Sequence, residues 1–439
     1  MLLNKILDCI HNRIKHIYEQ SVILQRLDDV ILLSIIATFV LATFMSSDVV
    51  GYLCFSTLGL TVVRVLTNPF DRFDCKKFEI FLLIYFMISI VSVAGSTLLM
   101  VSLKGFFKTF IYLSFYLSVV HHLKYNPKNV LPILFTIGGC ISFESIIGVS
   151  QNFIHVDEIS GWQDTSRLNP EQVMTRVYGT LKPLNPNLLG GYLVAGFSSL
   201  FGLCGYYLAE GKYKRGIIIS LFAILASVTL FLTGCRGAYI AFFAMCVTLF
   251  VISLKFFWES YKKIYLTVLS FVIGLGITVL SCFSSLRARV FSIFAMRSDS
   301  SNSFRFNVYQ SSLEMFKDNW LLGIGMGNQN FREIYGLYMK TGFDALSAYN
   351  IYLETAVESG IFALIAFLLF LVGLLVEGGK LIISSSDTQK VILASVAFVS
   401  IIGVMLHGMV DTVFFRPQIQ VIFWVMVAIL SNQIYGDNQ

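Results

Sequence analysis

The chain has 439 residues, of which 56% are hydrophobic and only 13% are charged, and its formal net charge is +6 at pH 7. Soluble domains carry about a quarter charged residues, so this composition excludes a soluble globular protein. Uncharged stretches of about 20 residues, the length that crosses a bilayer as a helix, recur from Ile31 to Leu430. Runs such as 216–233 and 361–376 are apolar on every face, which indicates helices rather than β-strands. The sequence therefore predicts an all-α, polytopic membrane protein.

The predicted elements begin with an arm at 1–28, in which apolar residues recur at helical spacing among lysines and arginines. This pattern is typical of an amphipathic helix that lies on the inner leaflet. Polar breaks then divide the chain into twelve predicted spans, at 29–46, 49–66, 79–98, 105–121, 130–150, 187–208, 216–234, 237–254, 264–282, 358–377, 391–408 and 417–434. The predicted regions are spans 1–5 at 29–150, a first outer segment at 151–186, spans 6–9 at 187–282, a longer and partly helical outer segment at 283–357, spans 10–12 at 358–434, and a cytoplasmic tail at 435–439.

The basic residues predict the orientation of these spans. With both termini in the cytoplasm, 18 of the 32 Lys and Arg residues fall on the inner side and only four in the short outer loops and adjacent helix ends, as the positive-inside rule requires. Nine of the 14 outer basic residues are Arg. Because the planar guanidinium binds phosphate or carboxylate oxygens bidentately, this bias indicates an anionic ligand at the outer face. The alternative is that each Arg only reaches the lipid headgroups.

Other polar residues carry weaker signals. The eight Cys residues are scattered and form no CxxC pair, so we expect neither a disulfide framework nor a metal site, and no cofactor. The glycine-rich run at 323–327 follows no predicted strand, so we interpret it as a turn for close backbone packing and not as a nucleotide loop. His121 and His122 fall in an inner loop, where we expect them to be solvated.

Five compact motifs lie on the predicted outer side. They occupy 176–179 followed by 185–192, then 233–237, 300–305, 322–328 followed by 346–354, and 407–411 followed by 416–417. In order and spacing they resemble the O-antigen ligase and polymerase superfamily (WaaL/Wzy-like membrane proteins), and most closely its cyanobacterial IctB branch, which is associated with bicarbonate transport. The resemblance implies a GT-C-like fold in the bacterial inner membrane, with the long outer segment in the periplasm.

The candidate ligand-binding residues come from these motifs. The resemblance implies that Arg236 and Arg305 bind the pyrophosphate of a polyprenyl-linked glycan. The Asn-Pro-Asn run at 185–187 predicts a helix start, which itself attracts an anion, although a plain turn and cap is the alternative. The other candidates for ligand binding are Arg176, Asn187, Tyr349, Asn350 and Arg416.

Tyr349 departs from the pattern of the superfamily. In glycan ligases and polymerases that resemble this chain, the position usually holds a His that is the candidate catalytic base, whereas a phenol with a pKa near 10 is a poor base at neutral pH. His407 and Asp411 are four residues apart, so on a continuous helix the carboxylate would orient the imidazole for proton transfer. A structural pair tied to Arg416 is the alternative, and Glu354 is a further candidate base.

Three functions remain open from the sequence. The first is a metal-independent membrane glycosyltransferase, in which Arg side chains stabilise the leaving pyrophosphate and the acceptor is a hydroxyl group. The second is IctB-type transport of bicarbonate, or support of it. The third is a catalytically silent relative that binds polyprenyl phosphate or partner proteins. None of the three involves nucleic acid, and all place the chain in the lipid bilayer.

Overall fold

A computed structural model describes residues 7, 11, 15–69, 76–154 and 175–435 of the chain. The protein is 82% helical, and no strand occurs within these ranges. Ten helices in the described ranges are long and apolar enough to cross a membrane. The prediction of an all-α, multi-pass membrane protein is therefore confirmed.

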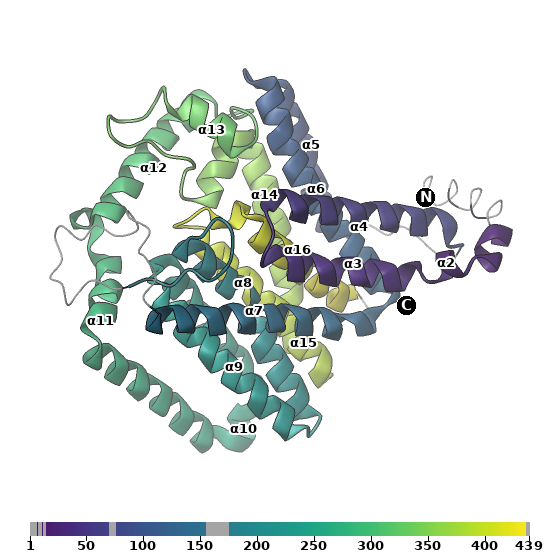
Figure 1. Ribbon diagram of the computed structural model, residues 1–439, viewed down its shortest axis with the longest axis vertical. Helices are drawn as coiled ribbons and strands as arrows, with labels where there is room; N and C mark the ends of the chain where they lie inside the picture. The colour runs from purple at the N-terminus through teal and green to yellow at the C-terminus, as the bar shows by residue number, and fades with distance from the viewer. Residues whose placement is uncertain (1–6, 8–10, 12–14, 70–75, 155–174, 436–439) are drawn as a thin grey trace.

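The N-terminal half forms one side of the helix bundle (Figure 1). Its helices are α2 (Val22–Gln25), α3 (Leu27–Ala42), α4 (Ser47–Thr67), α5 (Glu79–Ala94), α6 (Leu99–Tyr125), the 3₁₀ turn η1 (Pro127–Asn129) and α7 (Val130–Phe153). α3 and α4 lie side by side, and α4 also packs on α6. Much of the predicted arm at 1–28 lies outside the described residues, and the rest contains helical residues at 15–20, α2 and the first two residues of α3.

The C-terminal half supplies the centre of the bundle. Its long helices are α8 (Pro186–Ala209), α9 (Tyr213–Leu232), α10 (Arg236–Cys282), α14 (Ile351–Ser384), α15 (Thr388–His407) and α16 (Pro417–Tyr435). α8, α15 and α16 are the most deeply buried of these helices. α8 begins where the Asn-Pro-Asn run predicted, because the Asn185 side chain accepts a hydrogen bond from Asn187 N at 2.7 Å and Pro186 has no N–H to satisfy.

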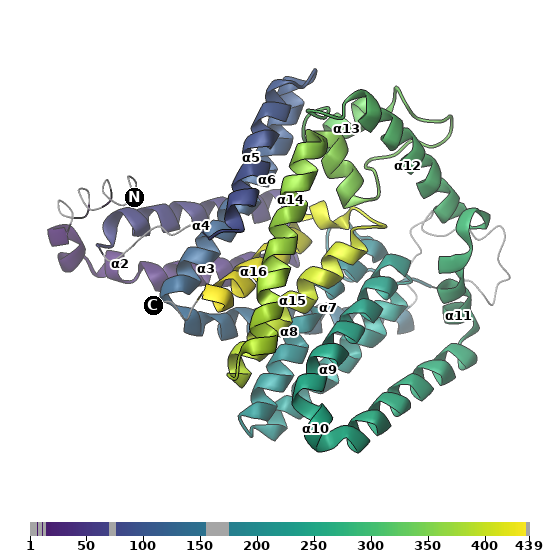
Figure 2. The ribbon, with the colours of Figure 1, turned by 180° about the vertical axis from the view of Figure 1, so that it is seen from behind.

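Each of the twelve predicted spans overlaps a helix, but only ten helices in the described ranges meet the length and composition needed to cross a bilayer. α3 and α5 have 16 residues each and fall short. The predicted eighth and ninth spans are joined in α10 across a kink at Tyr261, which gives the arms Arg236–Glu259 and Tyr261–Cys282. The second arm buries no side chain and stands apart from the bundle (Figures 1 and 2).

The long segment between α10 and α14 lies at the end of the molecule opposite α2 (Figure 2). It contains α11 (Ser284–Phe291), η3 (Ser292–Phe294), η4 (Met296–Ser298), α12 (Ser300–Asp318) and α13 (Asn328–Tyr335). We call this end of the molecule the loop face and define it as residues 284–350 together with the helix ends at 175–187, 233–237 and 407–417. Every motif that the sequence analysis identified lies on the loop face or begins there.

A break in α14 holds the loop face on the bundle. At Gly360 the backbone leaves the helical conformation (φ 79°, ψ 176°), and the Glu358 carbonyl that is freed accepts a hydrogen bond from Gly325 N at 3.0 Å. Gly323 and Gly360 both have positive φ, and a Cβ added to either would overlap a backbone carbonyl. The glycine-rich run is therefore a close-packing turn, as predicted.

The prediction for His121 and His122 is wrong. Both are buried, with exposed fractions of 9% and 1%. His121 Nε2 lies 3.2 Å from Arg64 Nη1, and His122 Nδ1 lies 3.8 Å from Asp28 Oδ1. Because α6 continues to Tyr125, the residues expected in a loop form a helical turn that packs on α4.

Candidate functional site

The turn between α9 and α10 is the centre of the candidate site. Its backbone carbonyls hold two guanidinium groups: Arg176 Nε donates to Thr233 O at 2.7 Å, and Arg289 Nε donates to Gly234 O at 2.8 Å. Gly234 has a φ of 63°, and a Cβ added there would lie 3.1 Å from Arg176 Nε. Glycine therefore allows the turn and the close approach of the Arg176 side chain.

Arg236 begins α10 immediately after this turn and is 8% exposed. Its Nη1 lies 2.8 Å from Asp299 Oδ1 and donates to Ser292 Oγ at 3.2 Å. Asp299 also caps α12 by accepting from Asn302 N at 2.9 Å. Burial raises the pKa of Asp299, but the hydrogen bonds from Arg236 and Asn302 outweigh burial and leave that pKa below its usual value. The carboxylate is therefore a stable anionic partner for Arg236.

Arg305 lies on the second turn of α12 and belongs to a second part of the network. It donates to Ser301 Oγ at 2.9 Å and to Asp411 Oδ2 at 3.5 Å. Asn187 Nδ2 donates to the same Asp411 oxygen at 3.1 Å, and Asn187 Oδ1 accepts from Arg176 Nη2 at 2.6 Å. Residues from four separate stretches of the chain are thus joined, and α12 connects this part to Arg236 through Asp299.

Four arginines, Arg176, Arg236, Arg289 and Arg305, form what we call the arginine cluster. Within the cluster, Arg236 contacts the carboxylate of Asp299 and Arg305 contacts that of Asp411. The described residues contain no group of three or more His, Cys, Asp or Glu side chains that could hold a metal ion.

Tyr349 lies beside this cluster in a strained backbone conformation, with a φ of 51°. Its ring centroid is 5.7 Å from Arg305 Cζ, and its carbonyl accepts from Tyr309 Oη at 3.1 Å. Burial raises the pKa of Tyr349, Asp411 raises it further, and the opposing effect of Arg305 is smaller. At neutral pH the phenol is therefore protonated, and its hydroxyl hydrogen is available for donation to a ligand.

The predicted pairing of His407 with Asp411 on one helix face is wrong. α15 ends at His407, and Gly408, whose carbonyl accepts from Ile351 N at 2.8 Å, caps it. Asp411 lies in the turn beyond and bonds to Asn187 and Arg305 instead. The imidazole of His407 is buried, with Nε2 at 3.6 Å from Cys235 Sγ.

Three other predicted site residues stand outside the network. Glu354 is 2% exposed, and its Oε2 accepts a hydrogen bond from Ala348 N at 3.1 Å. This hydrogen bond stabilises the loop that precedes α14. Asn350 caps α14 by accepting from Tyr352 N and Leu353 N, and its amide donates to Met409 O. Arg416 is exposed at the start of α16. Glu354 and Asn350 therefore have positions that a structural role explains.

The structure adds Arg289, Asp299 and Cys235 to the residues that the sequence identified. Arg289 belongs to the run at 284–289, which carries two Arg directly after an apolar span, and an Arg at that place already indicates proximity to the outer surface. Asp299 immediately precedes α12 and has the residue type of an N-cap. No sequence signal placed Cys235 beside His407, because that contact joins residues 172 positions apart.

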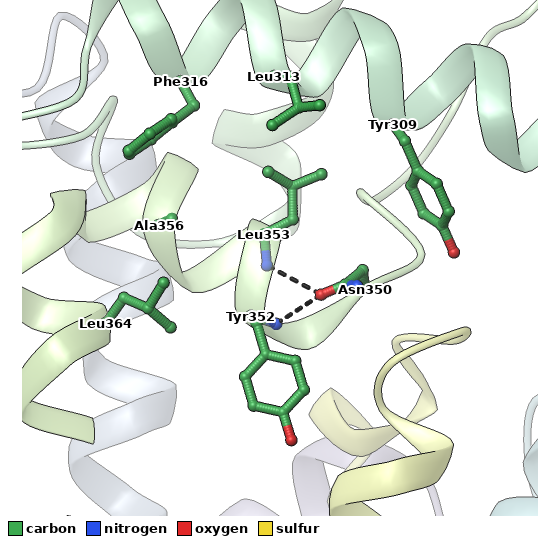
Figure 3. Close-up of a pocket in the computed structure, with 8 residues that line it drawn as sticks. All are labelled: Tyr309, Leu313, Phe316, Asn350, Tyr352, Leu353, Ala356 and Leu364. Carbon is green, nitrogen blue, oxygen red and sulfur yellow. Dashed lines mark hydrogen bonds between the residues drawn. The ribbon is translucent and has the colours of Figure 1, made fainter. Parts of the chain in front are cut away.

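An apolar pocket of about 420 Å³ lies between α12 and the start of α14 (Figure 3). It is lined by Tyr309, Leu313, Phe316, Asn350, Tyr352, Leu353, Ala356 and Leu364. Tyr309 lies one turn after Arg305 on α12 and donates to the carbonyl of Tyr349. The pocket is therefore adjacent to the arginine cluster.

The helical fold defines a multi-pass membrane protein with an arginine-rich site at one end. Residues 221–368 match the family described as O-Antigen ligase, so this stretch of the chain is similar to O-antigen ligases. The stretch includes Arg236, Arg289, Arg305 and Tyr349, whereas the rest of the network lies outside it. No curated protein matches the chain.

Proposed function

We propose that the protein binds a polyprenyl-pyrophosphate-linked glycan at the loop face and transfers the glycan to an acceptor hydroxyl. The observation that carries the proposal is the gathering of four guanidinium groups around the turn at 233–234 and the carboxylates of Asp299 and Asp411. Guanidinium groups bind phosphate oxygens bidentately, and a pyrophosphate that links a lipid to a sugar carries two negative charges. In this proposal the loop face lies in the periplasm and the bundle in the bacterial inner membrane, as the distribution of basic residues favours.

The hydrogen-bonding capacity of Arg305 supports an oxyanion ligand. Its Nε is buried and has no hydrogen-bond partner among the described residues. Buried donors are nearly always satisfied, and an unsatisfied one indicates a missing ligand or water. A phosphate oxygen would fill this place and would also compete with Asp411 for the guanidinium.

The pocket beside the cluster supports a lipid-linked ligand. Its lining is aliphatic and aromatic apart from the polar ends of Asn350, Tyr309 and Tyr352. Apolar surface of this kind gains about 25 cal/mol for each Å² removed from water by an isoprenoid chain. A pyrophosphate held at the arginine cluster would therefore have a place for its first isoprene units next to it.

The transfer step needs a leaving group, an acceptor and a base. The bond between the anomeric carbon and the phosphate oxygen breaks, the electron pair leaves with the lipid pyrophosphate, and the acceptor oxygen forms the new bond. The arginine cluster stabilises the charge on the leaving pyrophosphate. His407 accepts the acceptor's proton in this scheme, because an imidazole titrates near neutral pH, and the protonated Tyr349 donates a hydrogen bond to a ligand oxygen.

The IctB-type alternative, bicarbonate transport, has less support. Bicarbonate has no apolar part, whereas the arginine cluster adjoins an apolar pocket of about 420 Å³ that bicarbonate would leave unfilled. A catalytically silent relative would bind the same ligand but would not transfer the glycan. Measuring the release of polyprenyl pyrophosphate distinguishes it from the proposed transferase.

The test uses the purified full chain in lipid nanodiscs. A synthetic polyprenyl-pyrophosphate-linked monosaccharide is the probe, and both its dissociation constant and the release of polyprenyl pyrophosphate are measured. Arg236→Gln and Arg305→Gln are each expected to weaken binding about tenfold or more, because a hydrogen bond to a charged group contributes about 1.5–3 kcal/mol. Arg332→Gln, an exposed Arg that pairs with Asp344 on the same face, is the matched control. Flux of labelled bicarbonate into liposomes without binding of the lipid probe would refute the proposal.

A further inference from the structure

Cys235 is a buried residue of the turn between α9 and α10 to which the proposed function gives no role. It stands directly before Arg236, at the N-cap position of α10, and its backbone N–H donates to Thr233 Oγ1 at 3.2 Å. Its Sγ lies 3.6 Å from Nε2 of His407 at the end of α15. Both side chains are only 3% exposed. The turn that holds arginine side chains therefore also contacts the proposed base.

Neighbouring glycines pack the thiol and the imidazole closely against the surrounding helices. A Cβ added to Gly237 would lie 2.7 Å from His407 Cδ2 and 3.0 Å from His407 Nε2. A Cβ added to Gly190 on α8 would lie 2.9 Å from Cys235 Cβ. At such short distances a larger residue would displace the pair, so the packing of α8, α10 and α15 leaves the imidazole little room to turn.

The contact with Cys235 decides which nitrogen of His407 can accept a proton. A neutral imidazole has one N–H and one nitrogen with a free lone pair. If the thiol donated to Nε2, the hydrogen of the ring would be at Nδ1 and the lone pair would already be engaged. If Nε2–H donates to the sulfur, the lone pair at Nδ1 is free. The described residues supply His407 with no hydrogen bond besides that to Cys235, so Nδ1 is available to a ligand.

The sulfur of Cys235 is suited to the role of acceptor. Burial raises the pKa of Cys235, but the hydrogen bond and the charge of His407 outweigh burial and leave that pKa below its ordinary value. A sulfur that carries negative charge more readily is a better partner for an N–H of a cation. An imidazole that takes up a proton at Nδ1 becomes such a cation, and the acceptor at Nε2–H stabilises it.

We propose that Cys235 is the positioning residue of the proposed base: its sulfur accepts a hydrogen bond from His407 Nε2–H and thereby presents the Nδ1 lone pair to the acceptor hydroxyl. This inference rests on the proposed function. In the transfer step the acceptor's proton moves to Nδ1 while Nε2–H stays bonded to the sulfur. The acceptor oxygen bonds to the anomeric carbon, and the pyrophosphate leaves with the electron pair of the broken bond. Cys235 itself forms no covalent bond.

The experiment measures kcat and KM for release of polyprenyl pyrophosphate by the full chain in nanodiscs. The probe is the polyprenyl-pyrophosphate-linked monosaccharide, and the sugar hydroxyls of further probe molecules and water serve as acceptors. The variants are Cys235→Ala, Cys235→Ser and the matched control Cys246→Ala, and the melting temperature of each is measured. Cys246 lies on the same helix, is partly buried, and its sulfur has no hydrogen bond to the described part of the chain.

The two Cys235 variants separate hydrogen bonding from the filling of space. Cys235→Ala is expected to lower kcat about tenfold and to leave KM within about twofold, because it removes the partner of Nε2 but no group that contacts the ligand. Cys235→Ser keeps an acceptor atom, so its kcat is expected to stay within about threefold of that of the unaltered chain. Cys246→Ala should leave both constants unchanged.

A double-mutant cycle tests whether Cys235 acts through His407. His407→Gln alone is expected to lower kcat, because it removes the proposed base. Adding Cys235→Ala to that variant is expected to lower kcat by less than about twofold more, since the partner that Cys235 positions is already gone.

The outcomes separate this inference from the function beneath it. Rescue by Ser together with a non-additive cycle supports the inference. Equal losses in Cys235→Ala and Cys235→Ser, with a lowered melting temperature in both, would show that the thiol only fills space and would overturn it. An unchanged kcat in Cys235→Ala also overturns it, as does a further loss of about tenfold in the double variant. If the unaltered protein releases no polyprenyl pyrophosphate, the proposed function itself is refuted.

Discussion

Replacing Glu144 by Ala is expected to loosen the segment that carries Arg176. Glu144 lies in α7, is 0% exposed, and its carboxyl accepts hydrogen bonds from Thr180 N at 2.9 Å and from Thr180 Oγ1. The Thr180 hydroxyl also lies 3.3 Å from Thr43 O, so it keeps an alternative partner. The backbone N–H does not, and leaving a buried donor unsatisfied costs about 1–3 kcal/mol. We therefore expect Glu144→Ala to destabilise the protein by about 2 kcal/mol and Glu144→Gln, which keeps one carbonyl acceptor, by less.

The assay has two readouts, thermal melting in detergent and affinity for the polyprenyl-pyrophosphate probe. Because Thr180 follows Arg176 by four residues, release of Thr180 should lower both the melting temperature and the affinity. Ser145→Ala is the matched control, since Ser145 is buried on the same helix and its hydroxyl bonds only within that helix, to Ile141 O. A Glu144→Ala protein that melts and binds like the unaltered chain would show that this carboxyl does not position the segment.

Three further predictions concern the break in α14, the proposed catalytic base and the orientation of the chain in the membrane. Gly360→Ala should lower the melting temperature strongly, because φ is 79° there and the new Cβ would overlap a backbone carbonyl; an unchanged melting curve would contradict the account of the break in α14. His407→Gln removes the buried imidazole beside Cys235, so we expect turnover to fall with little change in probe affinity, and equal turnover would argue against His407 as the base. Lys340→Cys and Lys214→Cys, introduced separately into a chain freed of its other cysteines, should differ in whole cells: an impermeant maleimide is expected to label only the first, and the reverse pattern would invert the orientation.

The sequence was sufficient for the helices because their signal is local. An apolar run of about 20 residues crosses a bilayer whatever its neighbours are, so all twelve predicted spans fall on helices. The lengths of the helices were less predictable: α3 and α5 have 16 residues each and are shorter than a helix that crosses a bilayer. α6 runs past its predicted end, which is why His121 and His122 are buried rather than solvated.

The sequence also identified Arg236, Arg305, Asn187 and Arg176 as candidate ligand-binding residues, because they fall in the motifs on the predicted outer side. It did not show that the carboxylates pair with arginines, because an ion pair between Arg236 and Asp299 depends on where α12 begins in space. It suggested a His407–Asp411 pair from a spacing of four, and Gly408 ends the helix before that spacing can apply.

What the sequence alone determined is the class of the protein, its helical spans and the side of the membrane helices where its polar motifs gather, because hydropathy and charge act on each segment separately. Only the tertiary structure decided which of the gathered groups meet: the carbonyls of the turn at 233–234 hold Arg176 and Arg289, and Asp411 joins Arg305 to Asn187. These contacts connect positions tens to hundreds of residues apart, and a hydrogen bond forms only when packing brings donor and acceptor to about 3 Å.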